Sequence, residues 1–155
     1  MRPLAPKGGN DNVFTPKNVA KKIVSHFNPT GKILEPCRGM GAFTDIMCCD
    51  WYEIDEGRDF LKANGHWDWI ITNPPWSKIR PFLQKSMEVA DNIVFLCLIN
   101  AFWMKARQED MRRCGFGIKE ILMLDTPPKP WPQTGFSLGA VLIVKGWNGG
   151  IIIST

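Results

Sequence analysis

The chain has 155 residues, of which 45% are hydrophobic and 22% are charged, and its formal net charge is +4. These proportions are typical of a globular domain and exclude wholesale disorder, collagen and a coiled coil. The longest apolar run, Ile93 to Ile99, is far shorter than the roughly 18 to 20 residues of a membrane-spanning helix, so no such helix is expected.

The start of the chain, residues 1–12, is polar and rich in Pro and Gly, and it lacks the apolar core of a secretory signal. We expect it to form a flexible arm. The five cysteines are odd in number and none stands in a Cys-x-x-Cys pair, so we interpret them as reduced thiols. The two histidines do not complete a four-ligand zinc set, and no metal is expected. The expected location is therefore cytoplasmic, compatible with a bacterial, phage or viral context.

The first half of the chain predicts a helix followed by strands around a glycine loop. Apolar residues from Val19 to Phe27 recur at helical spacing, and Pro16 is placed to open that helix. There follow, in chain order, a strand at 32–35, a glycine loop at 36–43, a short helix, and strands at 51–54 and 69–72.

The second half continues this alternation. In chain order we expect a helix at 80–90, a strand at 93–99, a basic helix at 102–113, a strand at 120–124, a Pro-rich loop at 125–136, a strand at 138–147, and a hairpin turn at 148–150 into a last strand at 151–153. Strands that alternate with helices predict an α/β fold. Its sheet is expected to be Rossmann-like, doubly wound and mostly parallel, with antiparallel elements at its C-terminal edge.

The glycine loop is the first candidate site. Gly39 and Gly41 form a Gly-x-Gly after the first strand, where a backbone without Cβ lets a ligand approach closely, although this signal alone is weak. Glu53 ends the second strand, and a carboxylate there can accept hydrogen bonds from both hydroxyls of a ribose. A solvated acid at a strand end is the alternative interpretation of Glu53.

The sharpest feature is the run Asn73-Pro74-Pro75-Trp76, which directly follows an apolar strand. Ligands of α/β folds bind at that end of the strands. The prolines fix the backbone and lack amide donors, so carbonyl oxygens are presented. The Asn73 side-chain oxygen and the Pro74 carbonyl can both accept hydrogen bonds from one –NH2 group, while Trp76 offers a flat face to a planar ring. The glycine loop and Glu53 favour this interpretation over a Pro-Pro turn with a packed Trp.

Together these segments resemble a known enzyme family. Residues 34–43, 53–55, 58–61 and 72–76 look like motifs I to IV of the S-adenosylmethionine-dependent DNA adenine-N6 (amino) methyltransferases, in the order of the gamma-type enzymes. Val13-Phe14-Thr15-Pro16 resembles motif X, which also lies N-terminal in that group. The resemblance extends from Val13 to about residue 100. It implies a class I methyltransferase fold and S-adenosyl-L-methionine as the cofactor.

The resemblance also assigns roles to individual residues. It implies that Glu35, Pro36, Gly39 and Gly41 line the methionine end of the cofactor with Thr15 nearby, that Glu53 holds the ribose, that Ile54 packs on the adenine, and that Asp59 and Phe60 read the adenine edge. Asn73 completes this cofactor set. Asn73, Pro74 and Pro75 would present the acceptors for the target amine, and Trp76, in place of the commoner Tyr or Phe, would stack on the flipped base. The short helix after the glycine loop leaves Glu53 and Asp55 as alternatives for the ribose.

The implied chemistry needs few groups. The lone pair of an adenine N6 is delocalised into the ring, and two acceptors around its hydrogens stabilise the positive charge that develops as it attacks a sulfonium methyl. No general base is required before transfer, and positioning supplies much of the remaining acceleration. Because the amine lies inside a duplex, the base must be flipped out, at a cost that stacking on Trp76 would partly recover.

The surplus of positive charge lies in the second half of the chain. Residues 1–77 carry nine basic and nine acidic residues, whereas residues 78–155 carry ten and six. A phosphate-binding rim and a solvated helix face both explain this. The candidate nucleic-acid contacts are Lys78, Arg80, Lys105, Arg107, Arg112 and Arg113, together with Trp131 and Phe136 as a second wall for the flipped base. For Trp131, packing within a stiff surface loop is the alternative.

Several alternatives remain open at this point. The same tetrad occurs in RNA adenine methyltransferases and in enzymes that methylate a glutamine amide, and a non-catalytic methyltransferase-fold partner module is a further alternative. The Glu-Pro-x-x-Gly-x-Gly start and the N-terminal motif X favour DNA. Residues 1–155 are expected to form a single catalytic domain in a minimal form, without a target-recognition domain. A short or relaxed target sequence, a homodimer, or a partner that supplies specificity would then follow.

Overall fold

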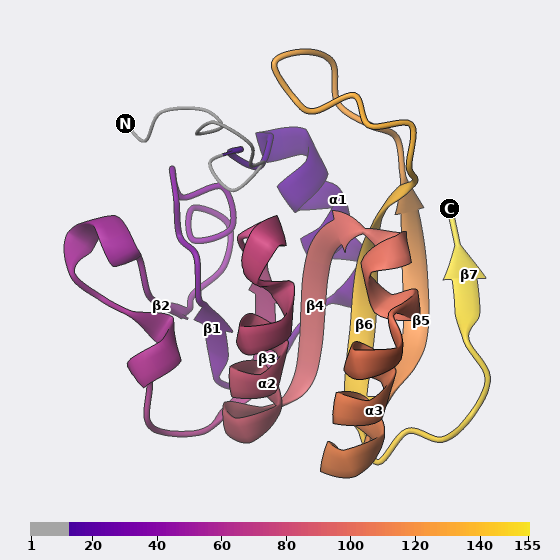
Figure 1. Ribbon diagram of the computed structural model, residues 1–155. Helices are drawn as coiled ribbons and strands as arrows, with labels where there is room; N and C mark the ends of the chain where they lie inside the picture. Colours follow the sequence, from indigo (N-terminus) through magenta and orange to yellow (C-terminus); the bar gives the residue numbers. More distant parts are fainter. Residues whose placement is uncertain (1–12) are drawn as a thin grey trace.

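The computed structural model describes residues 13–155, and the predicted flexible arm, residues 1–12, lies outside the described residues. A seven-stranded sheet forms the centre, with helices on both of its faces (Figure 1). No helix in residues 13–155 has the length and apolar character needed to cross a membrane.

The strands are β1 (Ile33–Glu35), β2 (Asp50–Trp51), β3 (Trp67–Thr72), β4 (Ala90–Leu98), β5 (Phe116–Leu124), β6 (Leu138–Lys145) and β7 (Ile152–Ser154). Their spatial order is β2-β1-β3-β4-β6-β5-β7. The strands β2, β1, β3 and β4 are parallel, and β6 runs antiparallel to both β4 and β5. The expected mostly parallel sheet is confirmed, and its antiparallel member lies toward the C-terminal side.

Three α-helices cover the sheet. Helix α1 (Lys17–Phe27) lies on one face, and α2 (Ile79–Val89) and α3 (Lys105–Cys114) lie on the other. Short 3-10 helices complete the chain: η1 (Ile54–Glu56), η2 (Phe60–Lys62), η3 (Trp76–Lys78) and η4 (Ile99–Trp103). The arrangement is that of a doubly wound α/β fold.

The core forms two layers because successive side chains of a strand point to opposite faces. In β4, Ile93 and Phe95 pack in the layer beneath α2 and α3, while Val94 and Leu96 pack in the layer beneath α1. All four side chains are fully buried, which confirms the expectation that residues 93–99 contain a strand covered on both faces.

The topology creates a crevice at the carboxyl ends of the strands. Strand β1 pairs with β2 on one side and with β3 on the other, so the chain leaves β1 in one direction and returns on its opposite side. At such a switch point the loops that follow neighbouring strands separate, and ligands of open α/β sheets bind there. The loops after β1 and β3 are those that begin at Pro36 and Asn73.

The prediction of a short helix after the glycine loop is wrong. Residues 42–47 form turns, with backbone hydrogen bonds from Asp45 to Gly41 at 2.8 Å and from Met47 to Phe43 at 3.1 Å. Residues 44–49 must carry the chain to the start of β2, and six residues make fewer than about two helical turns. The next strand, β2, is also shorter than expected, because its pairing with β1 ends at Trp51.

The prediction of a hairpin between the last two strands is also wrong. Strand β7 pairs in parallel with β5, through Glu120 opposite Ile152, and does not follow β6 as its neighbour. The N–H of Gly146 donates to the carbonyl of Gly115 at 2.7 Å, so the chain passes the start of β5 and then runs up its outer side (Figure 1). The expected helix at 102–113 is likewise divided between η4 and α3.

Candidate active site at the carboxyl edge of the sheet

The glycine loop forms one wall of the crevice. Gly39 and Gly41 have positive φ angles of +54° and +87°, a conformation that L side chains rarely adopt. A Cβ at Gly39 would stand 3.3 Å from the ring of Phe14, so the N-terminal segment lies directly against the loop. The loop is closed by a hydrogen bond from the N–H of Gly41 to the carbonyl of Arg38 at 2.9 Å.

Glu35, the last residue of β1, is the buried acid of the site, with 1% of its surface exposed. Its Oε1 accepts hydrogen bonds from the hydroxyl of Thr72 and from the N–H of Cys37. Burial raises the pKa of Glu35 to about 8, although the hydrogen bonds from Thr72 and Cys37 act in the opposite direction. A carboxyl in this state favours a cationic ligand, since a positive charge would compensate its desolvation.

Glu53 is held by the backbone on both oxygens. Its Oε1 accepts from the N–H of Gly39 at 3.0 Å, and its Oε2 accepts from the N–H of Asp55 at 3.0 Å. Glu53 is 4% exposed, whereas Asp55 is exposed in η1. The solvated-acid interpretation of Glu53 is therefore wrong, because this carboxylate is buried and links the glycine loop to the segment after β2.

Two adjoining cavities follow these residues. The first, here called the Glu35 cavity, lies between the glycine loop, the N-terminal segment and Asn73; the second, the Glu53 cavity, lies between η1, η2 and the start of α2. They meet at Cys37 and Pro75, which line both. Thr15, Glu35, Gly39 and Asn73 line the Glu35 cavity, and Pro36, Glu53, Ile54, Asp59 and Phe60 line the Glu53 cavity. Of the ten residues that the resemblance assigned to the cofactor, only Gly41 lines neither.

Asp59 and Phe60 are positioned by the turn that they begin. The Asp59 carboxylate accepts from the N–H of Leu61 at 3.0 Å and caps η2. Phe60 is 2% exposed, and its ring packs at 5.4 Å from that of Phe82 on α2. Phe60 therefore fixes this wall of the Glu53 cavity against the core.

The loop after β3 brings Asn73 to the Glu35 cavity. The Asn73 Nδ2 donates to the carbonyl of Val13 at 3.1 Å, and the Asn73 Oδ1 accepts from the indole Nε1 of Trp76 at 3.2 Å. The same indole N–H is 3.3 Å from the carbonyl of Leu96 on β4. Pro74 is buried, and Pro75 and Trp76 are half-buried.

A third cavity adjoins the Glu35 cavity beside the Pro-rich loop. It has a volume of about 690 Å³ and is lined by Val13, Phe14, Pro16, Asn18, Val19 and residues 125–131. Val13 and Phe14 also line the Glu35 cavity. Trp131 is 4% exposed and meets the Trp76 ring edge to face, with centroids 5.9 Å apart. Phe136 is 57% exposed and lines none of these cavities.

Sequence reasoning missed two arginines at the rim. Arg38 lines the Glu35 cavity and Arg58 lines the Glu53 cavity. Their guanidinium groups lie 4.6 Å and 4.2 Å from the ring of Trp51, and Arg38 also pairs with Glu56 at 3.2 Å. No spacing rule predicts this cluster, because it depends on the turn that returns Arg58 to Glu53 in an isolated bridge.

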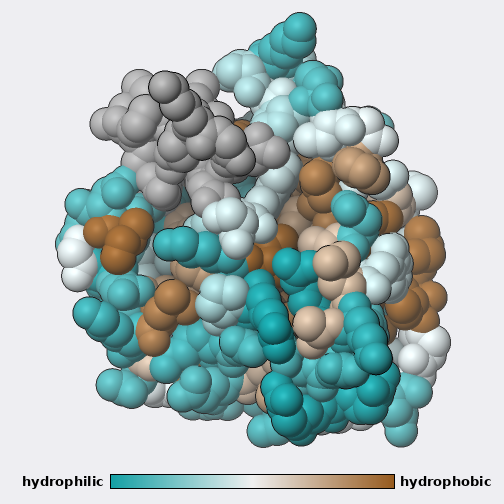
Figure 2. All heavy atoms as spheres, viewed as in Figure 1, coloured by the Kyte–Doolittle hydropathy of each residue, from teal (hydrophilic) through white to brown (hydrophobic). Residues whose placement is uncertain are grey.

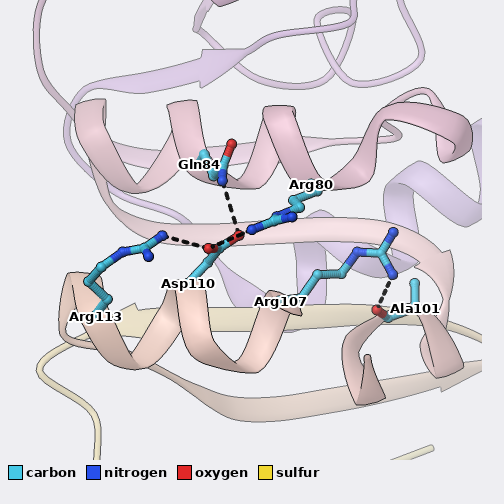
Figure 3. Close-up of polar contacts among 6 residues, drawn as sticks. All are labelled: Arg80, Gln84, Ala101, Arg107, Asp110 and Arg113. Atoms are coloured by element: carbon cyan, nitrogen blue, oxygen red, sulfur yellow. Dashed lines mark hydrogen bonds and ion pairs between the residues drawn. The ribbon is translucent and has the colours of Figure 1, made fainter. Parts of the chain in front are cut away.

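The basic residues on α2 and α3 are not gathered around the site. The buried carboxylate of Asp110 accepts from Arg80 at 2.8 Å, from Gln84 at 3.1 Å and from Arg113 at 2.7 Å (Figure 3). Arg107 donates to the carbonyl of Ala101 at 2.9 Å. Arg80 on α2 and Arg113 on α3 thus pair with Asp110, and Arg107 bonds the backbone; the phosphate-binding role of the three residues stays a prediction.

The remaining predicted cations differ in position. Arg112 is exposed in the last turn of α3. This turn leads into the amino end of β5, whereas Asn73 follows the carboxyl end of β3. Lys105 is exposed in the first turn of α3 and lies 3.8 Å from Glu109. Lys78 is exposed and lines the Glu53 cavity. Hydrophilic residues cover the outer face of α2 and α3, as Figure 2 shows. In residues 13–155 no three His, Cys, Asp or Glu side chains gather as a metal site would require.

The fold is similar to that of solved class I Rossmann-like methyltransferases. Neither a protein-family model nor a curated protein sequence matches the chain. Among solved structures, the M protein of the type I restriction enzyme EcoKI superposes with a TM-score of 0.63 at 16% identity, over 86% of this chain and 44% of that one.

Two further structures share the fold. The dimethyladenosine transferase of Plasmodium falciparum superposes with a TM-score of 0.59 at 12% identity, over 85% of this chain and 62% of that one. The magnesium protoporphyrin IX methyltransferase of Synechocystis, with bound S-adenosylmethionine, superposes with a TM-score of 0.55 at 12% identity, over 83% and 79%. These likenesses establish the fold.

Proposed function

We propose that this protein transfers the methyl group of S-adenosylmethionine to the exocyclic N6 amino group of adenine in DNA. The observation that carries the proposal is the position of Asn73. Its side chain lines the Glu35 cavity at the carboxyl end of β3, beside Trp76 and next to the glycine loop. An acceptor for an amine thus lines the cavity that also contains the glycine loop and Glu35.

The crevice fits the proposed cofactor. S-adenosylmethionine, when bound, supplies an electrophilic methyl on a sulfonium. The buried Glu35 carboxyl would hold its ammonium group, and Glu53, fixed by two backbone N–H groups, would accept from the ribose hydroxyls. Ile54 and Phe60 would pack around the adenine in the Glu53 cavity. The positive φ at Gly39 brings the backbone close to such a ligand.

Asn73 and Pro74 would act on the amine. The Asn73 Oδ1 and the Pro74 carbonyl accept its two hydrogens, which favours a pyramidal nitrogen and stabilises the charge that develops on it. The bound cofactor would supply the methyl group, and the amine would release a proton to solvent after the transfer.

The third cavity provides the target side of the site. It borders Trp131, whose ring contacts Trp76, and a flipped base placed there would meet aromatic side chains. Lys78 and Lys105 are candidate phosphate contacts, because both are exposed and each lies at the start of a helix, Lys78 as the N-cap of α2 and Lys105 as the first residue of α3.

Methylation with labelled cofactor tests the proposal. We expect label on DNA, mapped to N6-methyladenine, and less on RNA or on a glutamine peptide. Asn73→Ala should lower transfer at least about 100-fold while the cofactor dissociation constant changes little. The matched control is Asn64→Ala, because Asn64 is exposed and lines none of the three cavities.

Three outcomes would contradict the proposal. Full activity of Asn73→Ala would remove the assigned catalytic role. Label on RNA or on the peptide in preference to DNA would reassign the substrate. Cofactor binding without transfer to any of the three acceptors would favour a non-catalytic partner module.

A further inference from the structure

Trp76 makes a polar contact that its Tyr or Phe counterparts in the tetrad could not make in the same way. Its indole N–H points at the Asn73 Oδ1, 3.2 Å away, and at the carbonyl of Leu96, 3.3 Å away. On the other side of the same amide, the Asn73 Nδ2 donates to the carbonyl of Val13 at 3.1 Å. The Asn73 side chain therefore lies between a donor three residues away, Trp76, and an acceptor from a distant part of the chain, Val13.

These two partners select one orientation of the Asn73 amide. An Asn side chain can rotate by half a turn, which exchanges its oxygen and its NH2 group. An indole N–H only donates, and a backbone carbonyl only accepts. In the rotated amide, the NH2 group would face the Trp76 N–H, and the oxygen would face the oxygen of Val13. Only the observed orientation satisfies both contacts.

The indole itself is held by its surroundings. Trp76 is half-buried and packs against both core layers, and its ring meets Trp131 edge to face. Its N–H is shared with Leu96, a fully buried residue of the central strand β4. The donor that faces Asn73 is thus anchored to the sheet.

We propose that Trp76 is a positioning residue, whose indole N–H keeps the Asn73 Oδ1 available to the substrate amine. The inference rests on the proposed function. A carbonyl-type oxygen accepts two hydrogen bonds, so the contact with Trp76 leaves one acceptor site on Oδ1 for the amine. The two parts of Trp76 would then act separately. The ring face would stack on the base, and the indole N–H would hold the Asn73 side chain by a hydrogen bond.

The kinetic test compares two matched Trp→Phe variants. Trp147 also donates its indole N–H to a backbone carbonyl, that of Gly150 at 3.2 Å. Trp147 follows β6, which is antiparallel to β4, so it lies at the end of the sheet away from Asn73. We expect Trp76→Phe to lower kcat about tenfold, with the cofactor dissociation constant unchanged, and Trp147→Phe to keep the wild-type kcat. Benzothienylalanine at position 76, which keeps the ring shape but lacks the N–H, should reproduce the loss of kcat without the change in packing.

A spectroscopic test does not depend on turnover. In ¹H–¹⁵N spectra, Asn73→Ala should shift the indole resonance of Trp76 and leave that of Trp147 in place. An unshifted Trp76 resonance, or wild-type or higher kcat in Trp76→Phe and in the benzothienylalanine protein, would overturn the inference. Failure of the proposed function looks different, because the wild-type protein itself would then transfer no methyl to DNA.

Discussion

At the scale of single residues, two glutamates line different parts of the crevice. Glu35 is buried with a raised pKa and lines one cavity, while Glu53 is fixed by two N–H groups and lines the next. The first suits a cation and the second suits hydroxyl donors. Because they act on different parts of a ligand, their removal should have different signatures.

Cofactor binding should depend on pH through Glu35. Its pKa of about 8 in the free protein means that the carboxyl is mostly protonated near neutral pH and must ionise to pair with an ammonium. Affinity should therefore rise about tenfold from about pH 6 to about pH 7, with release of close to one proton. Calorimetry in buffers of different ionisation enthalpy measures both. In Glu35→Gln the affinity should be low and independent of pH, and a pH-independent wild type would refute the role.

The ribose assignment is tested by two neighbouring acids. Glu53→Ala should weaken cofactor binding about tenfold or more, because hydrogen bonds to a charged group are lost. Asp55→Ala should change it less, since Asp55 is exposed and does not line the Glu53 cavity. Equilibrium binding of the cofactor to both variants decides the matter. The reverse ranking would transfer the ribose role to Asp55.

At the scale of elements, Asp110 joins α2 to α3. The carboxylate is 1% exposed and bonds Arg80 and Gln84 on α2 and Arg113 on its own helix. Removing it leaves two guanidiniums without their acceptor (Figure 3). One of the basic residues predicted to bind phosphate, Arg80, therefore also connects α2 to α3 through Asp110.

Asp110→Asn should destabilise the protein by about 2 kcal/mol, measured by denaturant unfolding, because hydrogen bonds to a charged group are weakened. The hydrogen bond from Arg80 lowers the pKa of Asp110. The stability that it contributes is therefore present above the ordinary carboxyl pKa and is lost as the pH falls through the lowered value. Glu109→Gln, on the exposed neighbour, is the control and should leave stability within about 0.5 kcal/mol. Equal stability of the two variants would contradict this role.

At the scale of the molecule, residues 13–155 are mostly taken up by the sheet and the helices that cover it. The sheet and its helices use most of residues 13–124, and the third cavity is bordered by the Pro-rich loop and by residues between Val13 and Val19. Base-edge contacts need several side chains in a groove. Target choice by this chain should accordingly be limited.

We therefore expect this chain alone to methylate adenine in a short or relaxed sequence context, or to gain selectivity from a partner. Methylation of DNA of known sequence, followed by mapping of every N6-methyladenine, gives the context directly. A strict target of about six base pairs, methylated by the isolated monomer, would show that the loops suffice.

The sequence by itself determined the order of elements and the chemistry of the loops. Alternation of apolar runs predicted the doubly wound sheet; the residue types at Gly39, Glu53 and Asn73, and for Glu35 the resemblance to methyltransferase motifs, predicted which segments line the crevice. These properties are local, since periodicity and backbone preference act within a few residues. They could not predict where an exposed cation finds a partner or which edge the last strand joins.

Tertiary structure decided the rest. It assigned Arg80 and Arg113 to Asp110, placed β7 beside β5, and set the Trp76 indole against Asn73 and Leu96. The contacts of Arg80 with Asp110, of β7 with β5 and of the Trp76 indole with Leu96 depend on how whole elements pack, whereas Arg113–Asp110 and Trp76–Asn73 join residues three positions apart. Strand order, ion pairing between helices and the orientation of a side-chain amide are long-range properties, and the folded chain alone specifies them.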